Sequence, residues 1–312
     1  MSTIFTGIFI ISVLQTTLSL ATPLILGALG GVVSERAGVV NIAIEGMMLM
    51  AAFACAAAMT LTSGNLLAGI VAGIASGCLG GLFLGLLAVS LRVDQVVAGF
   101  VINIAAVGVT SFIFRSTFAN SNSAASETLP QLDIPLLSGI PALGQILFQQ
   151  NALIYVTFLL VALVHLYLFR TRLGLRARSV GENPKAADVA GIDVSLIRYG
   201  AVIASGAFAG VAGAYLVADV GSFSEGMTSG KGFIALAAVI FGKWRPVQAM
   251  LGALLFGFCD ALQTQLQQTP NMPIPVPVFA MIPYIATIVV LAGFIGRAIP
   301  PAADGIPYVK EA

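Results

Sequence analysis

Five polar side chains lie inside or beside otherwise apolar runs of this sequence, where they could offer hydrogen bonds to a passing solute. Asn41 and Glu45 flank the start of one run, and Asn103 interrupts another. Glu225 precedes a short apolar run, and Asp260 lies within a longer one. Ionisable groups in apolar helices are rare and costly unless they meet a partner or water. We therefore interpret these five residues as candidates for a polar pathway.

The segment 30–46 places Glu35, Arg36 and Glu45 between apolar runs and is rich in glycine, which predicts a broken helix. Because Glu45 follows Asn41 by four residues, we expect both on one helical face, lining the pathway or its gate. The alternative is that Glu45 lies at the membrane interface or caps a helix end. A solvated turn and a structural ion pair explain Glu35 and Arg36 equally well.

A second unusual segment is GENPKAADVAG, residues 181–191. Asn183 precedes Pro184 as an N-cap residue precedes a proline at the first helical position, and Gly191 follows as a terminator. The pattern predicts an exposed helix of about two turns with small residues on one face. Such a helix is suited to docking in a groove of another protein. The residues that we assign to this docking role are Gly181, Glu182, Asn183, Pro184, Ala186, Ala187, Ala190 and Gly191.

Catalytic and metal chemistry find little support in the sequence. The stretch around Gly226–Gly232 resembles a phosphate-binding loop, but Glu225 replaces its first glycine and Gly232 its Ser or Thr. The single histidine, His165, has no neighbouring Cys or carboxylate and is expected to be a packing residue. Cys55, Cys78 and Cys259 lie in apolar runs and are expected to be buried thiols. We expect no enzyme activity, no cofactor and no metal.

Composition requires a lipid environment. The chain has 312 residues, of which 58% are hydrophobic and 9% charged, with a net charge of +1. An ordinary soluble domain has about a quarter charged residues, so this chain could not cover a water-exposed surface. The near-neutral charge gives no indication of a nucleic-acid partner. The amino-terminal run lacks the basic start of a cleaved signal and is expected to be the first span.

We predict an all-α, polytopic bundle of about nine spans, eight to ten, in a single domain covering 1–312. The expected spans are 5–30, 39–62, 66–91, 95–115, 151–169, 199–218, 232–242, 247–266 and 277–296. The run 232–242 is too short to cross alone and is expected to be half of a broken or tilted element. Glycines spaced by four, as in 73/77/81/85 and 206/210, predict close helix packing.

The distribution of charge predicts the orientation. Six of the 14 basic residues fall within 170–198, so the positive-inside rule makes this coupling loop cytoplasmic. The stretch 116–150 has no Lys or Arg and contains three prolines, and it is expected to be an extracytoplasmic loop. Alternation then places the tail 297–312 inside and the amino terminus outside.

Three blocks carry a resemblance to a known family: SERAGVVNIAIEGMMLMAAF, GENPKAADVAGIDV and SGKGFIALAAVIFGKWRPVQAMLGALLFG. In their order and separation they resemble the permeases of nucleoside and simple-sugar ABC importers, nearest to the purine-nucleoside branch and related to ribose and branched-chain amino acid permeases. The resemblance implies that Gly181–Ile192 contacts a cytoplasmic ATPase. It also implies that Asn41–Gly46 lies beside the translocation pathway.

The same resemblance implies a multi-pass protein of the bacterial cytoplasmic (inner) membrane with several partners. These are a cytoplasmic ABC ATPase, a second permease of different sequence, an extracytoplasmic solute-binding protein and the lipid bilayer. A nucleoside is the expected solute, and a simple sugar is the alternative. A second class of function is an ion-coupled secondary carrier, in which Glu45 and Asp260 would be the coupling carboxylates. An intramembrane enzyme is disfavoured because no nucleophile–base pair is evident.

Overall fold

The computed structural model describes residues 7–117, 127–133, 135, 138–141, 143–268, 276–279, 281, 282, 285, 288 and 298–310. Seven of its helices are long and apolar enough to cross a membrane. They are α1 (Gly7–Arg36), α2 (Ile44–Leu61), α3 (Leu66–Gly85, extended by the π-helical turn η1, Leu86–Ser90), α4 (Gln95–Thr117), α6 (Ala152–Arg170), α9 (Val194–Val220) and α11 (Pro246–Gln268). The prediction of a helical membrane bundle is confirmed at this level.

The shorter elements are α5 (Leu143–Leu147), α7 (Arg172–Glu182), α8 (Pro184–Val189), α10 (Lys231–Phe241) and α12 (Val276–Phe279). The expected short element 232–242 corresponds to α10, which follows a non-helical stretch from 221 to 230. The predicted count of about nine spans is not confirmed. The last expected span, 277–296, lies mostly outside the described residues.

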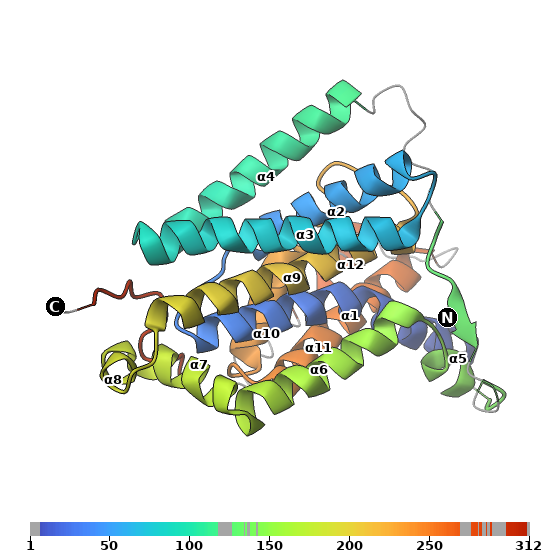
Figure 1. Ribbon diagram of the computed structural model, residues 1–312. Coiled ribbons are helices and arrows are strands. Elements are labelled where there is room, and N and C mark those ends of the chain that lie inside the picture. Colours follow the sequence, from blue (N-terminus) through green and yellow to red (C-terminus); the bar gives the residue numbers. More distant parts are fainter. Residues whose placement is uncertain are drawn as a thin grey trace.

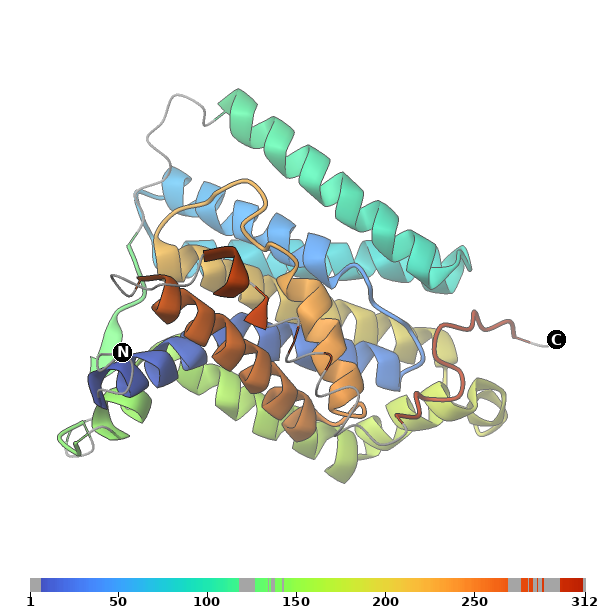
Figure 2. The ribbon, with the colours of Figure 1, turned by 180° about the vertical axis from the view of Figure 1, so that it is seen from behind.

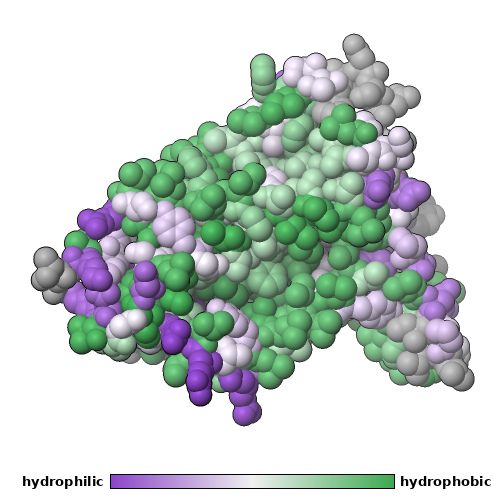
Figure 3. All heavy atoms as spheres, in the orientation of Figure 1, coloured by the Kyte–Doolittle hydropathy of each residue, from purple (hydrophilic) through white to green (hydrophobic). Residues whose placement is uncertain are grey.

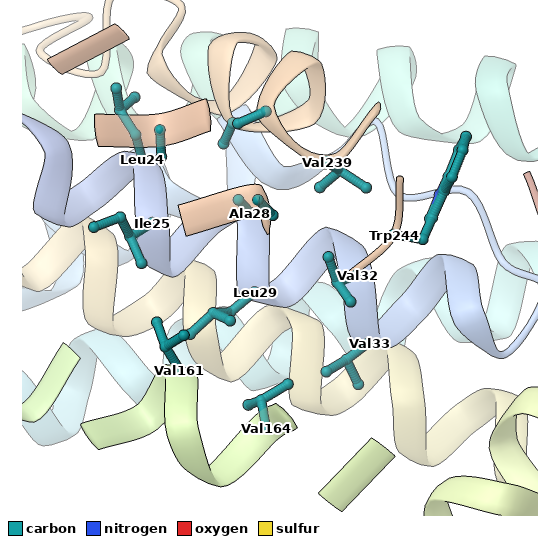
Figure 4. Close-up of a cluster of buried hydrophobic side chains, with 14 of the residues drawn as sticks. Leu24, Ile25, Ala28, Leu29, Val32, Val33, Val161, Val164, Val239 and Trp244 are labelled. Carbon is teal, nitrogen blue, oxygen red and sulfur yellow. The ribbon is translucent and has the colours of Figure 1, made fainter. Parts of the chain in front are cut away.

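Helix α1 is at the centre of the bundle, where it packs against α6, α9, α10 and α11 (Figures 1 and 2). Leu24, Ile25 and Leu29 of α1 are buried in one cluster with Val161 of α6 and Val239 of α10. Figure 4 shows these side chains between the helices. A helix that is apolar on all sides is typical of this buried position in a membrane bundle.

Glycines let α3 and α9 cross with their backbones in contact, as their spacing predicts. A Cβ on Gly210 would lie 2.7 Å from the carbonyl oxygen of Gly73, and one on Gly73 would lie 2.9 Å from Cβ of Ala214. Gly77 and Gly206 approach each other still more closely. Any larger residue at these positions would force the two helices apart.

Three expectations need correction. The chain is not entirely helical, because β1 (Gln131–Asp133) and β2 (Gln149–Asn151) form an antiparallel pair within the expected loop 116–150. The expected loop 170–198 contains a second helix, α7, which turns Gly174, Ala177 and Val180 inward. Cys55 and Cys259 are buried as expected, but Cys78 is only half-buried because it lies on a partly exposed side of α3.

Hydrophilic residues gather at the two ends of the bundle on the face that Figure 3 shows. A broad apolar band lies between them on this face, as expected for a protein that spans a bilayer. We call one end, which carries α7, α8 and residues 298–310, the coupling end; β1 and β2 lie toward the opposite end (Figure 1). The ring of His165 packs at a tilt against that of Phe169, with 5.1 Å between the centroids, which fits its expected packing role.

Candidate translocation and coupling sites

The chain leaves the helical conformation between α1 and α2, at residues 37–43, which we call the interior break. Its first amides turn back onto the end of α1: those of Ala37 and Val39 donate to the carbonyl oxygen of Ser34, at 3.0 and 3.2 Å. The hydroxyl of Ser34 donates in return to the carbonyl oxygen of Val39, at 2.6 Å. Irregular backbone inside a membrane protein needs such partners because lipid offers none.

Helix α4 contributes two side-chain amides to the hydrogen bonds of the interior break. The amide of Val40 donates to Oε1 of Gln95 at 2.8 Å. The Asn103 side chain binds the backbone on either side of the start of α2. Its Nδ2 donates to the carbonyl oxygen of Ile42 at 2.9 Å, and its Oδ1 accepts from the amide of Gly46 at 2.7 Å. Asn103 therefore stabilises the backbone conformation from Ile42 to Gly46.

Asn41 lies in the interior break itself, so the prediction that it shares a helical face with Glu45 is wrong. The helix begins at Ile44, three residues later. The Asn41 side chain is fully buried, and its Nδ2 donates to Oγ of Ser205 on α9 at 2.8 Å. Asn41 thus connects the interior break, which leads into α2, to α9. The prediction that Asn41 lies within a helix did not include this contact.

Glu45, in the first turn of α2, caps a different helix. Its carboxylate oxygens accept from the amides of Gly230 at 2.8 Å and Gly232 at 2.6 Å, at the start of α10. Gly230 has φ = 83°, a left-handed conformation that glycine adopts without strain. The free amides and the positive end of the helix dipole both favour a carboxylate there. Glu45 thereby joins the amino-terminal ends of two helices that are far apart in the sequence.

The spacing between α2 and α10 permits only glycine at position 232. A Cβ on Gly232 would lie 2.9 Å from Oε2 of Glu45, besides meeting the backbone of that residue. The alternative that Glu45 caps a helix end is thus close to what the structure shows, except that the capped helix is α10. Asn41, Glu45 and Asn103 come together around the start of α2.

The other two candidate residues lie apart from this group. Asp260 is half-buried on α11 and interacts electrostatically with Lys231, the first residue of α10. Glu225 forms a two-point ion pair with Arg115 at the end of α4, with both N–O distances 2.9 Å. Arg115 is 74% exposed, and its hydrogen bond lowers the pKa of Glu225 below the ordinary value.

Glu35 and Arg36 form neither a solvated turn nor an ion pair with each other. The buried carboxylate of Glu35 accepts from the indole Nε1 of Trp244. The Nε of Arg36 donates to the carbonyl oxygen of Trp244 at 2.8 Å. Both side chains therefore bind the turn that follows α10, so the end of α1 is joined to the end of α10.

The coupling segment, residues 181–191, has the capped helix that its sequence predicts. Oδ1 of Asn183 accepts from the amide of Ala186 at 3.0 Å, and Pro184 occupies the first turn of α8. Gly191 ends the helix with φ = 80°. Glu182, in contrast, is the last residue of α7 and does not belong to the short helix.

The members of the coupling segment divide between surface and core. Glu182, Asn183, Ala186, Ala190 and Gly191 are exposed. Gly181 is buried against Arg36, and Ala187 packs with Val180 and Val194. Val189, which we did not select, is 91% exposed and is the apolar tip of α8. Val189 therefore gives α8 an accessible apolar tip at this polar end of the molecule.

Sequence reasoning also missed the partners of the interior break and of the helix ends on either side of it, Glu35 and Glu45. These are Gln95, Ser205, Gly230, Gly232 and Trp244. Their polar or glycine character is visible in the sequence, but 55 to 209 positions separate each from its partner. Only Gln95 and Ser205, polar residues at the edge of or within apolar runs, gave a signal that could have singled them out.

Comparison with known proteins finds relatives that cover nearly the whole chain. A nucleoside ABC transporter permease, NupC of Lactococcus lactis, is 42% identical over 93% of this chain and 94% of the relative. A guanosine ABC transporter permease, NupQ of Bacillus subtilis, is 42% identical over 96% of each chain. A Haloferax volcanii permease named for glucose, TsgC13, is 37% identical over 91% of this chain and 92% of the relative.

A solved structure described as an inward-facing metal-chelate type ABC transporter shares the fold, with a TM-score of 0.52 and 17% identity over 90% of this chain and 85% of that one. The family model for the branched-chain amino acid transport system permease component matches residues 13–291. The residues matched by the family model include the interior break and the coupling segment. The chain therefore belongs to the family of branched-chain amino acid transport system permease components.

Proposed function

We propose that this chain is the membrane permease subunit of an ABC importer for nucleosides, and that a separate chain hydrolyses the ATP. The observation that carries the proposal is α8, a capped helix at a polar end of the bundle that presents Val189 to the outside. The two relatives at 42% identity, named for nucleoside and guanosine transport, support the choice of solute. In this role the chain has no enzyme activity of its own.

In the proposed mechanism, the exposed part of the coupling segment, with Val189 at its tip, docks in a groove of the ATPase. Closure of the ATPase on ATP displaces α8. The bundle responds by opening alternately to the two sides of the membrane. Asn183 is needed because its cap keeps a helix of only six residues folded while force is applied to it.

The interior break and the starts of α2 and α10 form the part of the pathway wall that changes shape. Asn41, Glu45 and Asn103 hold its irregular backbone through hydrogen bonds that can be exchanged when the helices move. Asp260 lies near the start of α10, and Glu225 ties α4 to the loop before α10. The small number of charges suits an uncharged polar solute such as a nucleoside.

We further propose a bacterial cytoplasmic-membrane location with the coupling end in the cytoplasm. The loop 170–198 and the tail 297–312 then face the ATPase, and 116–150 faces an extracytoplasmic solute-binding protein. A second permease of different sequence pairs with this chain. The exposed apolar side chains of α3 and α4, such as Leu67, Ile104 and Phe112, face either that second permease or lipid.

The proposal can be tested with the complex that co-purifies with this chain, identified by mass spectrometry and reconstituted in proteoliposomes. Wild type should take up labelled guanosine when ATP is supplied to the ATPase side. Val189→Glu should abolish uptake while the complex still inserts, and Val189→Ile should transport normally. Leu175→Glu serves as a position control, because it alters another exposed apolar residue, on α7, and it should transport normally. Normal uptake by Val189→Glu would contradict the coupling assignment.

A simple sugar is a second candidate solute because of the relative named for glucose. Excess unlabelled adenosine, ribose and glucose should be compared as competitors in the same assay. Competition by the nucleoside alone supports our choice. Competition by a sugar alone would transfer the assignment to sugars and leave the importer mechanism intact.

A further inference from the structure

The carboxyl-terminal residues 298–310, which we call the tail, lie against the coupling end and contact several separate parts of it (Figure 1). The amide of Ala303 donates to the carbonyl oxygen of Gly181 at 2.9 Å, and the amide of Ala302 donates to Oε2 of Glu182 at 3.3 Å. Both acceptors lie at the end of α7, directly before α8. The tail therefore binds the coupling segment through its own backbone amides.

Two side chains extend this attachment along α8. Lys310 forms an ion pair with Asp188, with 3.6 Å between Nζ and Oδ1. Tyr308 packs on the small cluster of Val180, Ala187 and Val194, which joins α7, α8 and α9. The tail thus follows the coupling segment from the end of α7 to the second turn of α8.

Arg198, near the start of α9, fixes the tail from the inside of the protein. It is only 1% exposed. Its Nη1 donates to the carbonyl oxygen of Ile306 at 2.9 Å, and its Nη2 donates to that of Ala303 at 3.4 Å. Asp304 supplies a nearby negative charge; burial raises the pKa of its carboxyl, and Arg198 opposes that shift. The two carbonyl oxygens and the nearby Asp304 carboxyl partly offset the cost of burying this guanidinium, whose Nε has no hydrogen-bond partner among the described residues.

The same point of the tail touches the interior break. A Cβ on Gly38 would lie 2.9 Å from Nη2 of Arg198 and 3.2 Å from the carbonyl oxygen of Ala303. A Cβ on Gly305 would lie 3.4 Å from Cγ2 of Val40. The break, the end of α7 and the tail therefore come together around Gly38 so closely that no side chain fits at this position.

Resting on the function proposed above, we infer that the tail is a tether that transmits displacement of α8 to the interior break and so to the start of α2. Arg198 is its positioning residue, because it holds the two tail carbonyl oxygens in place. From Val40 and Asn41 the connection continues to Gln95, Ser205 and α2, whose Glu45 holds α10. A continuous series of packed and hydrogen-bonded groups can carry such coupling.

The first test compares two shortened chains in the reconstituted complex, one ending at residue 297 and the other, as a control, at residue 310. Both ATP hydrolysis and guanosine uptake are measured. The chain ending at 297 should still assemble and hydrolyse ATP, but uptake per ATP should fall about tenfold. The control should match the full-length chain. Equal uptake per ATP in all three chains would overturn the tether, whereas absence of ATP-driven uptake in the full-length chain would overturn the proposed function instead.

A second test keeps the tail and can refute the inference even if the chain ending at 297 fails to assemble. Asp188→Cys and Lys310→Cys are combined and joined by a short bifunctional thiosulfonate reagent, because the two cysteines are too far apart for a direct disulfide, with the two single variants as controls. If the tail and α8 move as one unit, uptake per ATP stays the same after cross-linking. Loss of uptake on cross-linking, restored when a reductant cleaves the reagent, would show that the tail must leave α8 during transport and would overturn the inference.

Discussion

The coupling segment and the interior break satisfy their backbone polar groups in opposite ways. In the coupling segment the partner is local: Asn183 caps the amide of Ala186, three residues away. In the interior break, once the chain has turned away from the end of α1, the partners come from α4: Gln95 accepts from the amide of Val40, and Asn103 donates to the carbonyl oxygen of Ile42. The coupling segment can therefore keep its shape while it moves as a unit. The break depends on how α2, α4, α9 and α10 are arranged and is thus able to respond to their movement.

The largest effect is expected from Glu45→Ala, which removes the contact between the starts of α2 and α10. Two hydrogen bonds to a carboxylate are lost, and each contributes roughly 1.5–3 kcal/mol. The thermal unfolding midpoint of the purified complex should drop markedly, and guanosine uptake should fall to background. Glu45→Gln keeps an acceptor and should retain part of both. Wild-type stability and uptake in Glu45→Ala would show that the contact is dispensable.

Asn103→Leu should have the next largest effect, because it leaves the carbonyl oxygen of Ile42 and the amide of Gly46 buried without their partner. Each unsatisfied group costs about 1–3 kcal/mol. The matched control is Thr110→Val on the same helix, whose hydroxyl donates to the carbonyl oxygen of Ala106 within α4. Thermal unfolding should distinguish the two variants clearly. Equal midpoints would mean that Asn103 does not hold the break.

Asn183→Ala is expected to lower uptake per ATP while hardly changing the stability of the bundle. The lost cap contributes about 1 kcal/mol, and it acts on α8 alone. Asn65→Ala provides a chemically identical loss, since Asn65 caps α3 by accepting from the amide of Ala68 at 3.2 Å. That control should leave uptake per ATP unchanged. A similar loss of uptake per ATP in both variants would mean that the cap of α8 has no special role in coupling.

The smallest effect is expected at the exposed pair Arg115–Glu225. A carboxyl whose pKa is lowered on folding stabilises the protein above its unfolded pKa, and this contribution disappears as the pH falls through the folded pKa. The unfolding midpoint of wild type should therefore slightly exceed that of Glu225→Gln at pH 7, and the difference should shrink below about pH 4.3. A difference that grows on acidification would contradict the ion pair.

Local patterns predicted much of the fold. The lengths of the apolar runs placed the seven long helices to within a few residues at most ends, and Asn183, Pro184 and Gly191 predicted α8. The spacing of Gly73, Gly77, Gly206 and Gly210 predicted a close helix crossing. Each of these signals rests on residues that are neighbours in the sequence or in one helix.

Partners distant in the sequence could not be predicted in this way. Nothing near Glu45 indicates that it caps α10, and nothing near Glu35 indicates Trp244. Asn41 was misplaced because four-residue spacing implies a shared face only if both residues are helical, and the helix begins after it. The polarity of these residues indicated that each needs a hydrogen-bond partner, and the structure supplies one. Their contacts depend on the packing of whole helices, which one sequence does not reveal.

The most direct test of the account is to separate the energy sources for guanosine uptake by the reconstituted complex. ATP is held constant while a protonophore dissipates the proton gradient, and in a parallel sample the gradient is kept and ATP is omitted. We predict that uptake continues in the first sample and stops in the second. Uptake that stops with the protonophore and continues without ATP would contradict the importer and identify an ion-coupled carrier, with Glu45 and Asp260 as its coupling carboxylates.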